Sequence, residues 1–169
     1  VDLNLTGKVV IITWPAKGMG AAMTRKFAEE GCKLVLVGRD TGAIEPIAEE
    51  VRSNGAEAIV SACDITDAAA CESIVGVAQK SFGGRVDILV NIAGGSGPIG
   101  KTGAETTSEE FDEILTLNVN GCFHTIRAVA GPMIDQKYGK IVNVGGTFGM
   151  RGRAGRLAYS SSKWGLRGV

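Results

Sequence analysis

Short apolar runs alternate with longer stretches of helical period along the whole chain. Several of these runs show no polar alternation, as expected for strands of a parallel sheet that helices cover on both faces. The runs predict strands at 8–13, 33–37, 57–62, 86–91 and 140–144. The longer stretches between them predict helices at 18–30, 42–53, 67–82 and 108–136.

Local signals support these elements. Thr107, followed three residues later by Glu110, has the pattern of a capping box ahead of the last helix. Gly31 and Gly55 follow the first two helices as stop signals. Repeated strand–helix–strand units predict an α/β fold, a doubly wound and mostly parallel sheet of the Rossmann-like, three-layer α/β/α type. We expect residues 1–169 to form one dinucleotide-binding domain.

The composition excludes several classes of protein. Eighteen Lys and Arg balance eighteen Asp and Glu, so no net charge would attract nucleic acid or an anionic membrane. No apolar run approaches the roughly 20 residues of a membrane helix, and 44% hydrophobic residues exclude disorder. Glycine supplies 25 of 169 residues, about twice its usual share, which indicates tight turns and close backbone approaches.

Cysteine and histidine give no support for a metal site or a hydrolase. The cysteines show no CxxC spacing and lie in or beside apolar stretches, so we expect buried thiols in a reducing cytoplasm. They are Cys32, Cys63, Cys71 and Cys122. His124 is the only histidine, falls in a predicted helix and has no G-x-S-x-G motif to accompany it.

A glycine-containing turn joins the first predicted strand to the first predicted helix. It begins at Thr13, ends at Gly20 and includes Lys17, Gly18 and Met19. Glycines in such a turn let the backbone approach a pyrophosphate, whose negative charge is stabilised by the N-terminus of the helix. The turn therefore predicts a dinucleotide site.

The end of the second predicted strand selects between two cofactors. In a dinucleotide fold this end faces the adenosine ribose, where an acidic residue favours NAD and a basic one favours NADP. Arg39 stands there, and Lys17 could reach the same place, so we expect NADP(H). Asp40 is the argument for NAD, but it lies past the strand and could instead cap the second helix.

A tyrosine and a lysine stand four residues apart near the end of the chain. Tyr159 and Lys163 would share one face of a helix. A tyrosine with its ordinary pKa of about 10 is a poor acid–base catalyst, and a close positive charge lowers that pKa towards the working range. The pair follows the fifth strand of a sheet that begins with the glycine turn, which favours a catalytic role.

With these features the chain resembles the short-chain dehydrogenase/reductase family over essentially all of its length. The resemblance rests on six segments in the family's order. They are 13–20, Cys63-Asp64-Ile65-Thr66, Asn91-Ile92-Ala93-Gly94, Asn118-Val119-Asn120-Gly121, Ile141-Val142-Asn143-Val144, and Tyr159 with Lys163.

The resemblance implies a role for each matching residue in catalysis. Tyr159 would exchange a proton with the oxygen of a small alcohol or carbonyl substrate, and hydride would move to or from the nicotinamide. Lys163 would bind the nicotinamide ribose and lower the pKa of the tyrosine. Asn118 would anchor a water of the proton relay.

It also implies cofactor contacts and an oligomer. Asp64 and Ile65 would contact adenine, and Asn91, Ala93 and Gly94 would line the cofactor beside the fourth strand. The family commonly forms homodimers or homotetramers through its two long helices, and no metal is implied.

Three departures from the family pattern bear on activity. Trp14 stands in place of the first glycine, and Pro15 after it predicts extended backbone at the tryptophan. Its indole would either turn away from the nucleotide or impair binding. Gly146 stands thirteen residues before the tyrosine, where the family has a serine that polarises the substrate oxygen. Ile92 replaces a second asparagine, a smaller change.

The length is a further departure. Family members usually continue past the lysine helix, whereas this chain ends at Val169, so we expect a C-terminally incomplete domain without its last strands.

Two alternatives to an alcohol–ketone oxidoreductase stay open. One is a catalytically impaired member that binds a nucleotide or a partner, and the other is a nucleotide-sugar epimerase, which shares the Y-x-x-x-K pattern.

Overall fold

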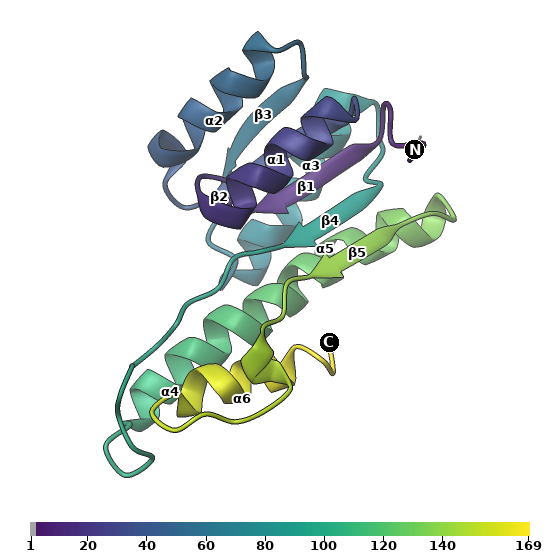
Figure 1. Ribbon diagram of the computed structural model, residues 1–169. Coiled ribbons are helices and arrows are strands. Elements are labelled where there is room, and N and C mark those ends of the chain that lie inside the picture. Colours follow the sequence, from purple (N-terminus) through teal and green to yellow (C-terminus); the bar gives the residue numbers. More distant parts are fainter. Residues whose placement is uncertain (1–2) are drawn as a thin grey trace.

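The computed structural model describes residues 3–169, in which five parallel strands form one sheet (Figure 1). The spatial order is β3-β2-β1-β4-β5. The strands are β1 (Val9–Thr13), β2 (Lys33–Gly38), β3 (Ala58–Ala62), β4 (Ile88–Asn91) and β5 (Lys140–Asn143). This order confirms the predicted doubly wound sheet, because the chain begins at the centre and winds outward in both directions.

Helices connect the strands as predicted. They are α1 (Gly18–Glu29), α2 (Thr41–Ser53), α3 (Ala68–Phe82), α4 (Ser108–Leu115), α5 (Gly121–Asp135) and α6 (Leu157–Gly165). The predicted helix at 108–136 is interrupted, since a π-helical segment, Thr116–Asn120, joins α4 to α5. A short 3-10 helix, Thr147–Gly149, precedes α6. The capping box at Thr107 is confirmed, with both of its hydrogen bonds to and from Glu110.

The sheet has a hydrophobic core on each face. Residues of β1 illustrate the alternation: Val9 and Ile11 pack with α3 and α5, whereas Val10 and Ile12 pack with α1 and α2. The β1 side chains are almost fully buried, which explains why the strand reads as an unbroken apolar run. The three layers are therefore those expected.

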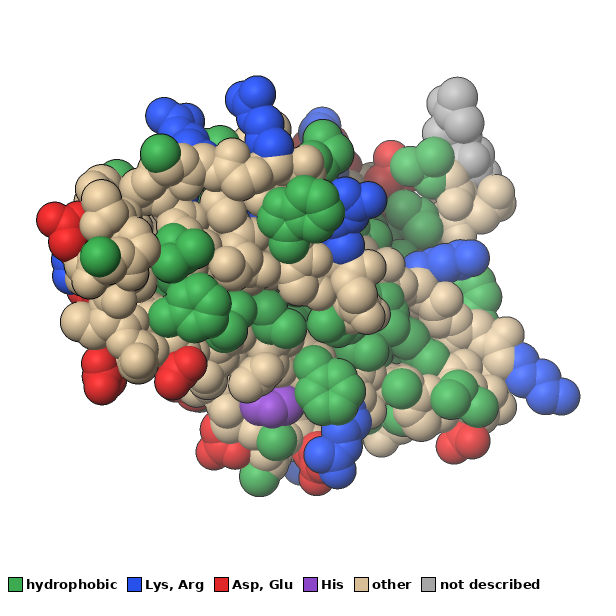
Figure 2. Space-filling model, turned by 90° about the horizontal axis from the view of Figure 1, so that it is seen from below, with side chains coloured by type: hydrophobic (Ala, Val, Ile, Leu, Met, Phe, Trp, Pro, Cys, Tyr) green, Lys and Arg blue, Asp and Glu red, His purple; other side chains and the backbone are tan. Residues whose placement is uncertain are grey.

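The outer strand β5 is less covered. Its Ile141 and Val142 are 40% and 45% exposed, and Phe123 and Ile134 of α5 are exposed as well. Figure 2 shows hydrophobic side chains gathered on the face that contains the histidine. Within residues 3–169 no helix combines the length and the apolar character needed to span a bilayer.

One buried carboxylate ties the start of β4 to the start of β1. Asp87 is fully buried, accepts a hydrogen bond from the Val9 N–H at 3.0 Å and pairs with Arg85 at 2.6 Å. Burial favours the protonated form, but the hydrogen bonds and the charges of Arg85 and Lys8 outweigh it and hold the pKa of Asp87 below its ordinary value.

Replacing this carboxylate is expected to destabilise the fold. Asp87→Asn should lower the free energy of unfolding by about 1–3 kcal/mol at pH 7, measured by urea denaturation. Because the folded-state pKa is depressed, the contribution is present above the unfolded-state pKa and disappears as the pH falls through the folded-state pKa. The difference between variant and wild type should therefore shrink in acid. Glu57→Gln, which removes an exposed partner of Lys33, is the control and should cost less.

Candidate active site

The glycine turn brings its backbone into close contact with α1. A Cβ on Gly20 would lie 2.0 Å from the carbonyl oxygen of Trp14, so only glycine fits at this position. Above Gly18 there is open space, with nothing within 4 Å of where its Cβ would stand. The turn thus leaves room at the N-terminus of α1, where unpaired N–H groups can bind an anion.

The backbone at Trp14 differs from the prediction. Its φ is +55°, in the left-handed region, so the extended geometry expected from Pro15 is wrong. Tertiary contacts override the proline: the Trp14 N–H donates to the Val37 carbonyl at 2.9 Å, and the Trp14 carbonyl packs against Gly20. The indole is 44% exposed and forms a wall of the site while the space above Gly18 stays open.

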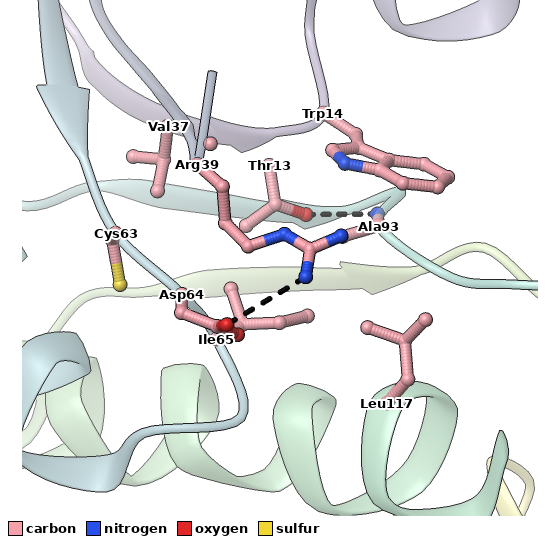
Figure 3. A pocket seen from close by; sticks show the side chains of 10 residues that line it. Thr13, Trp14, Val37, Arg39, Cys63, Asp64, Ile65, Ala93 and Leu117 are labelled. Carbon is pink, nitrogen blue, oxygen red and sulfur yellow. Dashed lines mark hydrogen bonds and ion pairs between the residues drawn. The ribbon is translucent and has the colours of Figure 1, made fainter. Parts of the chain in front are cut away.

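A small cavity lies where the carboxyl ends of β1, β2 and β3 meet. It has a volume of about 20 Å³, and Figure 3 shows the Arg39 side chain reaching across it towards Asp64. The two groups form an ion pair at 3.8 Å. Hydrogen bonds from the N–H and hydroxyl of Thr66 lower the pKa of Asp64, with a smaller contribution from Arg39. Thr13, Ile65, Ala93 and Leu117 are among the other residues that line this cavity.

A larger cavity of about 520 Å³ adjoins it on the α1 side. Lys17, Met19 and Gly20 line it together with Arg39, so both predicted cations face one space. Asp40 also lines this cavity, but its carboxylate caps α2 by accepting the Ala43 N–H at 3.0 Å. The prediction that Asp40 caps the second helix is therefore confirmed.

Thr13 fixes the start of the loop after β4. Its buried hydroxyl accepts hydrogen bonds from the N–H groups of Ile92 and Ala93, both at 3.0 Å. Asn91 lies behind this loop and is buried. Its amide donates to Asn143 of β5 at 3.0 Å, and its carbonyl accepts from Thr125 of α5 at 2.7 Å. Asn91 thus positions the strand ends and is not among the residues that line the two cavities.

Tyr159 and Lys163 lie on α6 beside the end of β5. The Lys163 ammonium is buried, donates to the Val144 carbonyl at 3.0 Å and lies 5.8 Å from the centre of the Tyr159 ring. Burial lowers the pKa of Lys163 from its ordinary value. A Cβ on Gly146 would lie 3.4 Å from the Tyr159 hydroxyl. Position 146 therefore borders the phenol.

Asn118 joins the π-helical segment to two other elements. Its side-chain oxygen accepts the Gly95 N–H at 2.7 Å, and its amide donates to the Gly95 carbonyl at 3.0 Å and to Ser162 at 2.8 Å. A Cβ on Gly94 would lie 2.9 Å from that oxygen and 3.7 Å from the Lys163 ammonium. The structure thus brings Gly94, Asn118 and Lys163 together.

Sequence reasoning missed three residues of the site. Gly95 and Ser162 hold Asn118, and Leu117 lines the small cavity. Each of the three is next to a predicted residue, but no spacing rule links Gly95 to Asn118 across 23 positions. Their contacts arise only from the fold.

Comparison with known proteins identifies the family. The sequence profile described as short chain dehydrogenase matches residues 8–169. The chain belongs to the short-chain dehydrogenase family. Its fold matches the crystal structure of NAD+-bound xylitol dehydrogenase with a TM-score of 0.91 and 34% identity, over 96% of this chain and 62% of the other. A metagenomic short-chain oxidoreductase in complex with NADP matches with a TM-score of 0.90 and 34% identity, over 97% and 73%.

A similar relative among characterised sequences is 2,5-dichloro-2,5-cyclohexadiene-1,4-diol dehydrogenase LinX from Sphingobium indicum. It is 32% identical over 165 residues, which are 97% of this chain and 64% of LinX. This short-chain dehydrogenase chain therefore spans less than two thirds of the length of LinX.

The close contact at Gly20 gives a testable prediction for the turn. Gly20→Ala should lower the free energy of unfolding by about 1–3 kcal/mol, because the Trp14 carbonyl must move to admit the methyl group. Gly76→Ala is the control: Gly76 lies inside α3 with open space around it, and the change should stabilise by about 0.5–1 kcal/mol. Urea denaturation of both variants measures the difference, and equal stabilities would contradict the geometry of the turn.

Proposed function

We propose that the protein is an oxidoreductase that transfers a hydride between NADP(H) and an alcohol or ketone, with Tyr159 as the acid–base group. The carrying observation is the convergence of Tyr159, Lys163, Asn118 and Gly94 where the carboxyl ends of β4 and β5 meet α6. Similar proteins with bound NAD+ and NADP support a nicotinamide dinucleotide as the cofactor.

The residues present fit such a cofactor. Open space above Gly18 at the start of α1 suits a pyrophosphate, and the adjoining cavity of about 520 Å³ has room for the adenosine half. Asp64 and Ile65 line the small cavity next to it, where the adenine edge would lie. Gly94 leaves space beside Lys163 that a side chain would fill, which suits the nicotinamide ribose. The cofactor would supply or accept the hydride when bound.

The chain's own residues would handle the proton. Tyr159 would donate its hydroxyl proton to the substrate oxygen during reduction and accept it during oxidation. The Lys163 ammonium, 5.8 Å from the ring, would stabilise the negative charge that remains on the phenolic oxygen. Asn118 would position the surrounding groups through Gly95 and Ser162 and anchor a water of the relay.

The preference for NADP over NAD rests on charge. Lys17 and Arg39 face the same cavity, and Asp40, the one acidic group that lines it among residues 3–169, is engaged as a helix cap. A ribose phosphate would take Arg39 away from its exposed pair with Asp64, which costs little. We also expect a homodimer or homotetramer, which the exposed apolar residues on α5 support. A cytoplasmic location is expected as well, and the four free, buried cysteines support it.

A titration and a tyrosine variant test the proposal. NADPH should bind more tightly than NADH, measured by the change in its fluorescence. Tyr159→Phe should keep NADPH affinity but lower kcat for carbonyl reduction by about 10²–10⁴-fold, because no hydroxyl can donate the proton. Tyr138→Phe, the other tyrosine of the chain, is the control and should leave kcat unchanged. Absence of NADPH binding would defeat the proposal, and binding without turnover would favour the impaired alternative.

Gly146 provides a second prediction. A serine there would place its Cβ 3.4 Å from the Tyr159 hydroxyl, an ordinary contact distance, and could donate to the substrate oxygen. Gly146→Ser should therefore raise kcat by about 10²-fold. Gly146→Ala adds the same carbon without the hydroxyl and should give no gain. If serine also gives none, Thr147 or water already supplies the hydrogen bond.

A further inference from the structure

Three arginines lie in the segment between β5 and α6, next to the proposed acid–base residue. They are Arg151, Arg153 and Arg156. The guanidinium carbon of Arg156 lies 4.5 Å from the centre of the Tyr159 ring. Arg153 and Arg156 also lie over the ring of Phe148, at 5.2 Å and 5.7 Å. Two guanidinium groups are thus held close together beside Tyr159.

No carboxylate within residues 3–169 forms an ion pair with any of these three arginines. The segment that packs against them is the loop after β4: the Gly100 N–H donates to the Gly155 carbonyl at 2.9 Å, and the two loops run side by side (Figure 1). The acidic groups of this region are engaged elsewhere. Glu105 accepts from Thr102, and Glu110 pairs with Lys101.

Arg156 is also incompletely satisfied. One terminal nitrogen donates to the Ser96 carbonyl at 3.3 Å, while its Nε is buried and has no acceptor in the described part of the chain. A buried N–H without an acceptor is unfavourable. In addition, Arg156 is the N-cap residue of α6, where the helix dipole favours anions and opposes a cation. An anionic ligand on the guanidinium would offset the unfavourable placement of this cation at the start of α6.

We propose that the substrate carries a carboxylate a few bonds from its reacting carbonyl or hydroxyl carbon, and that Arg156 binds this carboxylate. This inference rests on the proposed function. Arginine matches a carboxylate with two parallel N–H donors, and the two terminal nitrogens of Arg156, one of which makes only a 3.3 Å contact with the Ser96 carbonyl, can form such a fork. Because the guanidinium carbon lies 4.5 Å from the centre of the Tyr159 ring, a short acid such as a 3-oxo acid could bring its carboxylate to Arg156 and its carbonyl to Tyr159.

The experiment compares a hydroxy acid with its neutral ester. Binding of 3-hydroxybutanoate and of methyl 3-hydroxybutanoate is measured by calorimetry, with and without NADP+. The acid should bind at least about 10-fold more tightly than the ester. Arg156→Gln should weaken binding of the acid by about 10- to 100-fold and leave the ester unchanged. Reduction of 3-oxobutanoate, which takes one hydride from NADPH and one proton, should show the same preference in KM.

Two variants separate binding from a structural role. Arg127→Gln removes an equal charge from α5, where Arg127 pairs with Glu72, and should not change affinity for the acid. Arg156→Lys keeps the charge but loses the fork, so its affinity for the acid should fall between those of wild type and Arg156→Gln. NADPH affinity and thermal unfolding of each variant report whether its fold is intact.

The outcomes distinguish this inference from the proposed function. If NADPH binds and the ester binds as tightly as the acid, the carboxylate inference is wrong while the oxidoreductase proposal stands. If NADPH does not bind, the oxidoreductase proposal falls, and an acid preference that Arg156→Gln abolishes would still support the anion site. A coenzyme A thioester that outcompetes the acid and is insensitive to Arg156→Gln would overturn the assignment.

Discussion

The buried ammonium of Lys163 is the group on which the arrangement of the site depends. It donates to the Val144 carbonyl at the end of β5 and thereby fixes α6 against the sheet. A buried cation is unfavourable unless polar groups surround it, and burial lowers its pKa. Gly94 leaves the space beside it open, and Asn118 borders the same space. The loop after β4 and the π-helical segment thus meet α6 around this cation, and the Tyr159 ring lies 5.8 Å from it.

The two halves of the site obey different constraints. In the half proposed to bind the nucleotide, the backbone must be able to approach a ligand closely: Gly18 has no side chain and open space above it, and Gly20 packs on the Trp14 carbonyl. In the half proposed to be catalytic, polar side chains are held in place, since Asn118 uses both ends of its amide on Gly95 and Ser162. Trp14 fits the first half only because tertiary hydrogen bonding keeps its backbone at φ +55°, with the indole forming a wall of the site. A residue foreign to the family pattern is thus accommodated at a cost in backbone strain.

Local sequence signals predicted the elements well, because strands and helix ends depend on nearest neighbours. The capping box at Thr107 and the Asp40 cap of α2 are of this kind, and the i, i+4 spacing placed Tyr159 and Lys163 on one helix. The π-helical segment escaped prediction, since its 5-residue turn has no local signature and follows from the packing of Asn118. The left-handed backbone at Trp14, the Arg39–Asp64 pair and the contact between Gly95 and Asn118 are equally long-range effects. The cofactor contacts of the individual site residues and the domain boundaries stay predictions.

Net charge was the least informative property of this sequence, and the structure explains why. The chain is neutral overall, yet cations from separate segments face the carboxyl edge of the sheet: Lys17 and Arg39 at one end, Lys163 and Arg156 at the other. Many of the acidic groups are used in local pairs and caps, such as Asp87 with Arg85 and Asp40 with α2. The charge around the site is therefore positive although the chain is neutral on average, which suits the two ligands proposed above: a phosphorylated dinucleotide beside β2 and an acidic substrate beside α6.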